Sequence, residues 1–244
     1  MLESLKAASP SEAGLFFLIA NVLIFTGSVL LCWLLGSTFK TRRIFDRWEP
    51  LRPPELAAAG ACVVLNAGVS VGGWWLWKHG MITLRPTTWP AAAVDCLLMI
   101  GAMDLGMYVF HRLAHWPPAY RLVHRFHHRH ETTNPISLFV LHPLEVLGFG
   151  GLMIAFLAAY PMTLGGLMAY LAVNVLFGTL GHSGVEPFPA RLKSIPVLRL
   201  IGTSTFHAEH HEHPKYNFGF YTLLWDKLFG TLDPEYEQRF TGKH

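Results

Sequence analysis

Apolar stretches long enough to cross a lipid bilayer constrain this chain more than any other feature of its sequence. Residues 15–36, 55–77 and 91–110 form three such stretches, and each is close to the ~20 residues that a helix needs to span a ~30 Å hydrocarbon core. The first stretch has neither a basic leader nor a small-residue cleavage motif, so we interpret it as a retained helix. At 52% hydrophobic residues, the chain is more apolar than ordinary soluble domains. The sequence therefore predicts an all-α integral membrane protein.

A fourth apolar stretch, residues 144–180, is too long for one span. The pair Tyr160-Pro161 interrupts it, and proline ends a helix because it lacks a backbone donor. We expect a helical hairpin here, which together with the three spans makes a bundle of about four transmembrane helices. The loop before the second span carries five lysine and arginine residues and the loop after it carries two. The positive-inside rule places the first loop, and the chain after the third span, in the cytoplasm.

Histidines are concentrated after the third span. Twelve of the 14 lie between His111 and His213, mostly in the motifs HRLAH (111–115), HRFHH (124–128) and HAEHH (207–211). Side chains three and four residues apart share a helix face, so we expect each motif to point its imidazoles one way. His182 brings the number to nine, whereas His130 and His213 fall outside the repeated spacing. Because neutral imidazole favours zinc, copper, iron and nickel, we predict a metal centre in a cytoplasmic, histidine-rich helical cap.

Nine ligands are too many for one metal ion. A catalytic zinc usually takes three protein ligands plus water, whereas two six-coordinate metals offer twelve positions and leave about three for water or oxygen. This count favours a pair of irons. The Glu-x-x-His motif of soluble di-iron carboxylate bundles and the HExxH motif of zinc proteases are both absent. A membrane zinc hydrolase acting on lipid amides is the alternative. A metal carrier is disfavoured because its ligands would lie along the spanning helices.

Longer motifs around these histidines resemble the fatty acid hydroxylase and sterol desaturase superfamily of integral-membrane di-iron enzymes. DLGMYVFHRLAH is similar to the family's D-x3-Y-x2-HR-x2-H lead-in and AYRLVHRFHH to its Y-x3-H-x2-HH, while HPLE, HSG and WDKLFGTL recur in the sterol-modifying branch. The resemblance covers roughly residues 95–233. It implies a catalytic domain at 91–244, preceded by two N-terminal membrane helices within 1–90.

The resemblance implies nine iron ligands, which are His111, His115, His124, His127, His128, His182, His207, His210 and His211. Some fatty-acid members have a further histidine where this chain has Gly178, so one metal is expected to have a more open shell or to recruit water or Asn174. Asp104, an acid in a predicted membrane helix, is a candidate to accept a ring N–H of a ligating histidine; the alternative is a snorkelling acid. His142 is a candidate for the same pocket or for a polar cap at the hairpin.

The reaction implied by the resemblance is hydroxylation or desaturation of an unactivated C–H bond in a sterol, fatty acyl or isoprenoid lipid. Two iron ions would be the cofactors and O2 the co-substrate. Because no dinucleotide-binding fingerprint is present, we expect electrons from a partner, either a ferredoxin or a b-type cytochrome with its reductase. The net charge of +3 is spread through polar loops, so no nucleic acid partner is expected. Short loops without retrieval signals favour a bacterial inner membrane.

Overall fold

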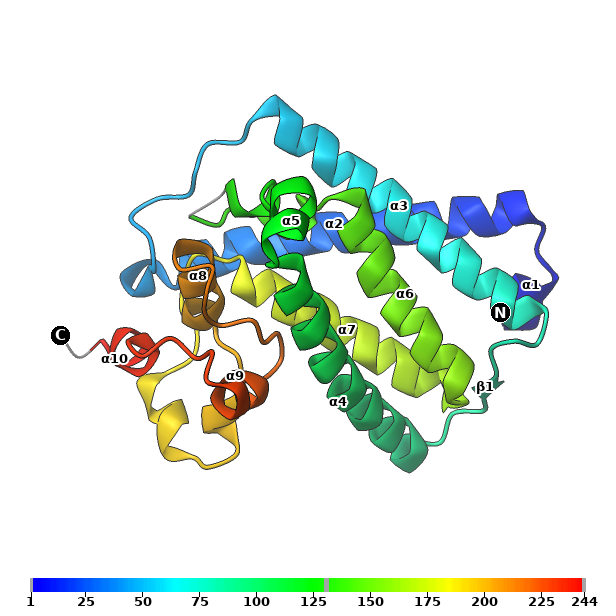
Figure 1. Cartoon of the computed structure of the whole chain (residues 1–244). Coiled ribbons are helices and arrows are strands. Elements are labelled where there is room, and N and C mark those ends of the chain that lie inside the picture. The colour runs from blue at the N-terminus through cyan, green and yellow to red at the C-terminus, as the bar shows by residue number, and fades with distance from the viewer. Residues whose placement is uncertain (1, 130–131, 243–244) are drawn as a thin grey trace.

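The computed structural model describes residues 2–129 and 132–242, and the regular secondary structure of these residues is almost entirely helical (Figure 1). The long helices are α2 (Pro10–Thr38), α3 (Pro53–Lys78), α4 (Trp89–Ala114), α6 (Pro143–Ala159) and α7 (Leu164–Gly181). The short ones are α1 (Leu2–Ala7), α5 (Pro117–Ala119), α8 (Ser204–Glu212), α9 (Leu224–Phe229) and α10 (Tyr236–Thr241). Single 3-10 or π turns cover Lys40–Arg42, Tyr120–His124, His127–Arg129, Ser137–Phe139, Ala190–Ser194 and Leu198–Leu200. The predicted all-α fold is confirmed.

Four of the described helices, α2, α3, α4 and α7, are long and apolar enough to cross a membrane. Helix α6 is apolar but has 17 residues, or about 25 Å at 1.5 Å per residue. The predicted break is confirmed, because α6 ends at Ala159 and α7 begins at Leu164. Both helices pack against α4. The protein is therefore a multi-pass membrane bundle.

Polar residues at the helix starts fix where the apolar stretches begin. Ser9 Oγ accepts the backbone N–H of Glu12 at 3.3 Å, and the Glu12 carboxylate accepts the N–H of Ser9 at 2.8 Å. Thr163 Oγ1 accepts the N–H of Gly166 at 3.1 Å at the start of α7. Such caps satisfy the first backbone donors of a helix, which are costly to leave unpaired next to lipid.

At one end of the bundle, the loop between α3 and α4 meets the connection between α6 and α7. Strand β1 (Leu84–Arg85) pairs in parallel with β2 (Met162–Thr163). The buried carboxylate of Asp95 accepts hydrogen bonds from Arg85 Nη2 at 2.8 Å, Tyr160 OH at 2.8 Å and Thr163 N at 2.5 Å. These contacts hold the hairpin tip against α4.

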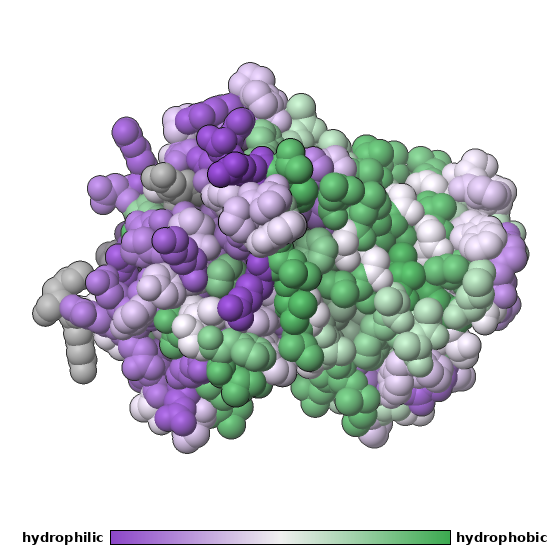
Figure 2. All heavy atoms as spheres, in the orientation of Figure 1, coloured by the Kyte–Doolittle hydropathy of each residue, from purple (hydrophilic) through white to green (hydrophobic). Residues whose placement is uncertain are grey.

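At the opposite end, the basic loop after α2 contacts the chain that follows α7. Arg42 Nη2 donates to Phe188 O at 2.6 Å, Trp48 Nε1 donates to Ser183 O at 3.1 Å, and Ile44 N donates to Gly184 O at 3.0 Å. The short helices α8 to α10 gather at this end and form a cap (Figure 1). Figure 2 shows an apolar surface over the long helices and a mostly hydrophilic surface over the cap. The basic loop and the cap thus share one end of the bundle.

Candidate metal centre

All nine histidines predicted as ligands converge where the helices meet the cap. In the described part of the chain they form two groups, one of five (His111, His115, His124, His128, His210) and one of four (His127, His182, His207, His211). Within each group the candidate ligand nitrogens lie within 4.8 Å of one another. Each group is large enough to hold one transition-metal ion.

Five segments of the chain position these rings. His111 lies in the last turn of α4 and His115 is its C-cap. A π turn carries His124, and the 3-10 turn His127–Arg129 carries the next two. His182 is the C-cap of α7, and α8 carries the remaining three histidines. HRFHH therefore does not form the regular helical segment that its spacing predicts.

The expectation that each motif points its imidazoles one way is wrong for the two doublets. His127 and His128 belong to different groups, and their ring planes lie at 88° to each other. His210 and His211 also divide between the groups, with ring planes at 82°. Successive residues on a helix are about 100° apart, so a doublet serves two metal positions and not one.

Backbone carbonyls fix the Nδ1 side of three rings. The pairs are His111 Nδ1 with Phe218 O at 2.9 Å, His127 Nδ1 with Val140 O at 3.2 Å and His210 Nδ1 with Tyr216 O at 2.6 Å. A carbonyl oxygen only accepts, so in these rings Nδ1 carries the hydrogen. In the neutral ring, Nε2 is then left with its lone pair, which is the form that binds a metal.

Two side chains orient further rings. The carboxylate of Glu145 binds His124 Nδ1, and Ser137 Oγ lies 2.8 Å from His182 Nδ1. Both Glu145 and Ser137 are fully buried. A carboxylate that accepts the second ring N–H of a ligating histidine fixes its tautomer and makes it a more basic ligand. Sequence reasoning did not assign either residue, although Glu145 lies in the HPLE motif that it singled out.

The inward nitrogens fit a bound cation. His124 Nε2 lies 3.2 Å from His111 Nε2 and 3.1 Å from His128 Nε2, and His128 Nε2 lies 3.1 Å from His210 Nε2. Because His111 and His124 both carry their hydrogen on Nδ1, their facing Nε2 lone pairs repel each other unless a cation lies between them. His115 Nε2 is buried with no hydrogen-bond partner among the described residues. An all-imidazole donor set of this kind suits iron, copper, nickel or zinc.

Burial keeps these rings neutral. Desolvation, reinforced by the neighbouring imidazoles, holds the pKa of His127, His128, His207 and His210 well below the usual 6.5. Desolvation disfavours the charged form of a base. Protons therefore compete weakly with a metal ion for these nitrogens.

Asp104 does not support a ligand ring. Its carboxylate accepts hydrogen bonds from Tyr221 N and Thr222 N at 3.1 Å each, from Thr222 Oγ1 at 2.5 Å and from Trp225 Nε1 at 3.1 Å. It lies two turns of α4 before His111, about 10 Å along the axis. Asp104 instead anchors the segment that precedes and begins α9.

The other two predicted supporting residues also contact partners outside the histidine groups. His142 is the N-cap of α6, where its Nδ1 accepts the N–H of Leu144 at 3.2 Å. Of the two alternatives for His142, the structure therefore shows the polar cap. Asn174 Oδ1 accepts the hydroxyl of Tyr221 at 2.6 Å, so it lies within the helix packing.

The Gly178 position is closed by a leucine. A Cβ on Gly178 would come within 2.8 Å of Leu138 Cδ1. The chain has no histidine at this position, and its nine candidate ligands form groups of five and four. His213 binds Asp233 Oδ2 through Nδ1 at 3.1 Å, apart from both groups, and His130 lies outside the described residues.

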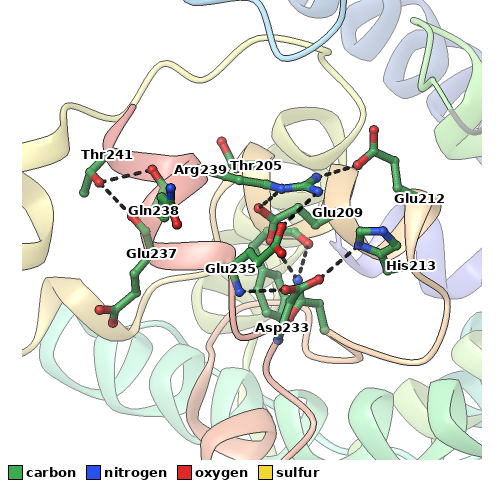
Figure 3. Close-up of polar contacts among 12 residues, drawn as sticks. Thr205, Glu209, Glu212, His213, Asp233, Glu235, Glu237, Gln238, Arg239 and Thr241 are labelled. Atoms are coloured by element: carbon green, nitrogen blue, oxygen red, sulfur yellow. Dashed lines mark hydrogen bonds and ion pairs between the residues drawn. The ribbon is translucent and has the colours of Figure 1, made fainter. Parts of the chain in front are cut away.

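Helix α10 braces the ligand-bearing helix α8. The guanidinium of Arg239 lies 2.6 Å from Glu212 Oε2 and 3.4 Å from Glu235 Oε2, with Glu209 Oε1 at 3.9 Å (Figure 3). Glu209 is buried on α8, and this burial raises its pKa to about 8. These contacts join the end of the chain to α8.

A cleft opens beside the group of four histidines, between the end of α7 and the cap. Apolar side chains dominate its wall, which is lined by Phe177, Gly178, Leu180, Gly181, His182, Gly202, Thr203, Phe206, His207 and Phe220. Two of the nine histidines, His182 and His207, thus line an apolar cleft.

Known proteins are similar to this chain over the part that carries the histidine groups. The model of the fatty acid hydroxylase family matches residues 96–231, more than half of the chain. A Delta(7)-sterol 5(6)-desaturase of Eremothecium gossypii is 30% identical over 151 residues, covering 59% of this chain and 39% of that protein. The very-long-chain aldehyde decarbonylase GL1-1 of Oryza sativa subsp. indica is 36% identical over 149 residues, covering 59% and 24%. The chain thus spans about a quarter to two fifths of the length of these relatives. No solved structure matches it.

Proposed function

The chain belongs to the fatty acid hydroxylase family, and from this we propose that it is a membrane di-iron oxygenase that hydroxylates or desaturates a C–H bond of a lipid. The observation that carries the proposal is the convergence of nine imidazoles into groups of five and four, which contain no other ligand type among the residues that the structure describes. When bound, the two irons would activate O2 with two electrons that another protein provides. We assign the nine histidines as their ligands and residues 91–244 as the catalytic domain.

The chain's own residues prepare the centre. The carbonyls of Phe218, Val140 and Tyr216 and the carboxylate of Glu145 hold ring hydrogens on Nδ1, so that Nε2 faces inward. Burial of the rings excludes water, which strengthens electrostatic interactions at the centre. The protein's contribution to such chemistry is to hold the ligands in a fixed orientation before the substrate binds.

The substrate we propose is a sterol, fatty acyl or isoprenoid lipid that approaches through the apolar cleft beside His182 and His207. This cleft is narrow and would have to widen to admit a lipid. Phe177 and Phe220 lie in the wall of this cleft, where they would hold an alkyl chain. The relatives are named for a sterol and for very-long-chain aldehydes, which are both extended apolar molecules. Placement of the chain relative to the irons would decide between hydroxylation and desaturation.

Electrons would come from a separate protein, a ferredoxin or a b-type cytochrome with its reductase. The exposed Arg121, Arg125 and Arg129 lie beside the histidine turns and offer an acidic carrier a docking surface. We place this face in the cytoplasm because the basic loop lies at the same end. The expectation of a bacterial inner membrane gains no support from the relatives above, which come from eukaryotes.

Metal analysis of detergent-purified protein tests the proposal. We expect about two irons per chain, with Mössbauer spectra of iron-57 protein showing a coupled pair. His127→Ala should lose iron, because one of four imidazoles is removed from its group. The matched control is His213→Ala, a histidine of the same cap outside both groups, which should retain both irons. One tightly held zinc and no iron uptake would instead support the lipid amide hydrolase.

A further inference from the structure

The segment 218–229 runs along the sides of α4 and α7 and does not rest on their ends. Tyr221 OH donates to Asn174 Oδ1 at 2.6 Å and lies 3.1 Å from Tyr170 OH, and both of these partners are on α7. On α4, the ring of Tyr108 stacks on Phe229 with centroids 5.6 Å apart and planes at 16°. Asp104, described above, holds the same segment one turn further from the cap.

Helix α7 sets the depth of these contacts. Its 18 residues span about 27 Å, which is no more than the ~30 Å hydrocarbon core of a bilayer. If α7 crosses the membrane, nearly all of it lies within that core. Asn174 lies seven residues before Gly181, the last residue of α7, or about 10 Å along the helix axis. The segment that binds Asn174 and Tyr170 must then share their depth.

The outer face of this segment is mainly apolar. Its exposed charged side chain is Lys227, whose Nζ lies 3.8 Å from Glu237 Oε1. Leu224, Leu228 and Phe229 of α9 are 44%, 66% and 52% exposed. They adjoin α4, whose Leu105 and Val109 are also exposed and lie in a membrane span. In Figure 2, apolar spheres extend from the band over α4 to the place where Figure 1 shows α9. The lipid-facing surface of the bundle therefore continues onto the cap.

Buried carboxylates satisfy the irregular backbone of the segment. Asp226 accepts the N–H of Phe218 at 2.8 Å and of Gly219 at 2.7 Å. Asp104 accepts the N–H groups of Tyr221 and Thr222. Non-helical backbone at membrane depth is tolerated only where protein buries it and pairs its polar groups. This requirement gives a physical reason for two buried acids beside a membrane helix.

We propose that residues 218–229 form a re-entrant element embedded in the leaflet on the cap side, with lipid acyl chains covering Leu224, Leu228 and Phe229. The occupant of the α9 face is lipid because the face is continuous with the lipid-facing side of α4. The histidine groups then lie at the depth of the lipid headgroups. An apolar substrate would reach them without leaving the bilayer.

Spin labelling in lipid nanodiscs tests this inference independently of the metal chemistry. Leu228→Cys carries a nitroxide on α9, Leu105→Cys reports a lipid-facing position on α4, and Asp46→Cys reports an exposed position in the loop after α2. The three native cysteines are buried, and protein without an introduced cysteine measures their background. Collisions with apolar O2 and with a water-soluble nickel chelate are compared for each label.

We expect the label at residue 228 to match that at 105, with O2 collisions several-fold more frequent than chelate collisions. A ratio equal to that at residue 46 would place α9 in water and overturn the proposal. Low collision rates with both reagents would also overturn it, since another protein surface would then cover α9. Leu224→Cys repeats the measurement four residues away on the same exposed face.

Discussion

At the scale of single residues, His124 shows how neighbouring groups set the chemistry of one ring. Glu145 holds its Nδ1, and its Nε2 lies between the Nε2 atoms of His111 and His128. Glu145 also caps α6, because its Oε2 accepts the N–H of His142 at 3.0 Å. One buried carboxylate therefore links the start of a membrane helix to a metal position.

The substitution Glu145→Gln should lower iron affinity by about 10- to 100-fold, the usual effect of losing an orienting partner. The amide has one acceptor oxygen where the carboxylate has two, and it lacks the negative charge that attracts the ring N–H of His124. Competition with a chelator of known affinity measures the change. Glu237→Gln, an exposed residue of α10, is the control. Equal iron affinity in both variants would show that Glu145 serves only as a helix cap.

At the scale of elements, glycines set how closely the membrane helices approach. A Cβ on Gly150 of α6 would come within 2.6 Å of Val69 Cγ1 on α3 and 3.3 Å of Val69 Cβ. Valine has one strongly preferred rotamer in a helix, so it cannot easily move away. Small residues at such contacts are typical of helix packing in membranes.

Gly150→Ala should therefore destabilise the bundle by about 1–3 kcal/mol, the common cost of overpacking. The adjacent Gly151→Ala is a matched control, because its Cβ would have no neighbour within 4 Å. The midpoint of thermal unfolding in detergent, followed by circular dichroism, compares the two. Adding Val69→Ala should restore much of the loss. A destabilisation shared by both glycine variants would mean that the helix contact is not its cause.

At the scale of the whole molecule, the two ends of the bundle carry different parts of the chain. The loop after α2 and the cap lie at one end, where Trp48 meets Ser183. The loop before α4 and the connection before α7 lie at the other, where Leu84 pairs with Met162. Because α2, α3, α4 and α7 would cross the membrane, these ends should face opposite compartments.

Cysteine labelling with a membrane-impermeant reagent should show this arrangement. Asp46→Cys and Glu237→Cys should react from the same side of sealed vesicles, and Thr83→Cys from the opposite side. The positive-inside rule predicts that the first two face the cytoplasm. All three positions are exposed, and labelling after detergent addition controls for reactivity. Reaction of Asp46→Cys and Glu237→Cys from opposite sides would contradict the fold.

The sequence by itself predicted the spans, the break at Pro161 and the nine histidines that the structure brings together. These features depend on hydropathy, proline chemistry and local spacing, which neighbouring residues specify. Only the tertiary structure decided the five-to-four division, the role of Glu145 and the contact of Asp104 with Thr222, 118 residues away. The physical reason is that these outcomes depend on the relative positions of distant segments. Where those segments lie is set by packing of the whole bundle and cap.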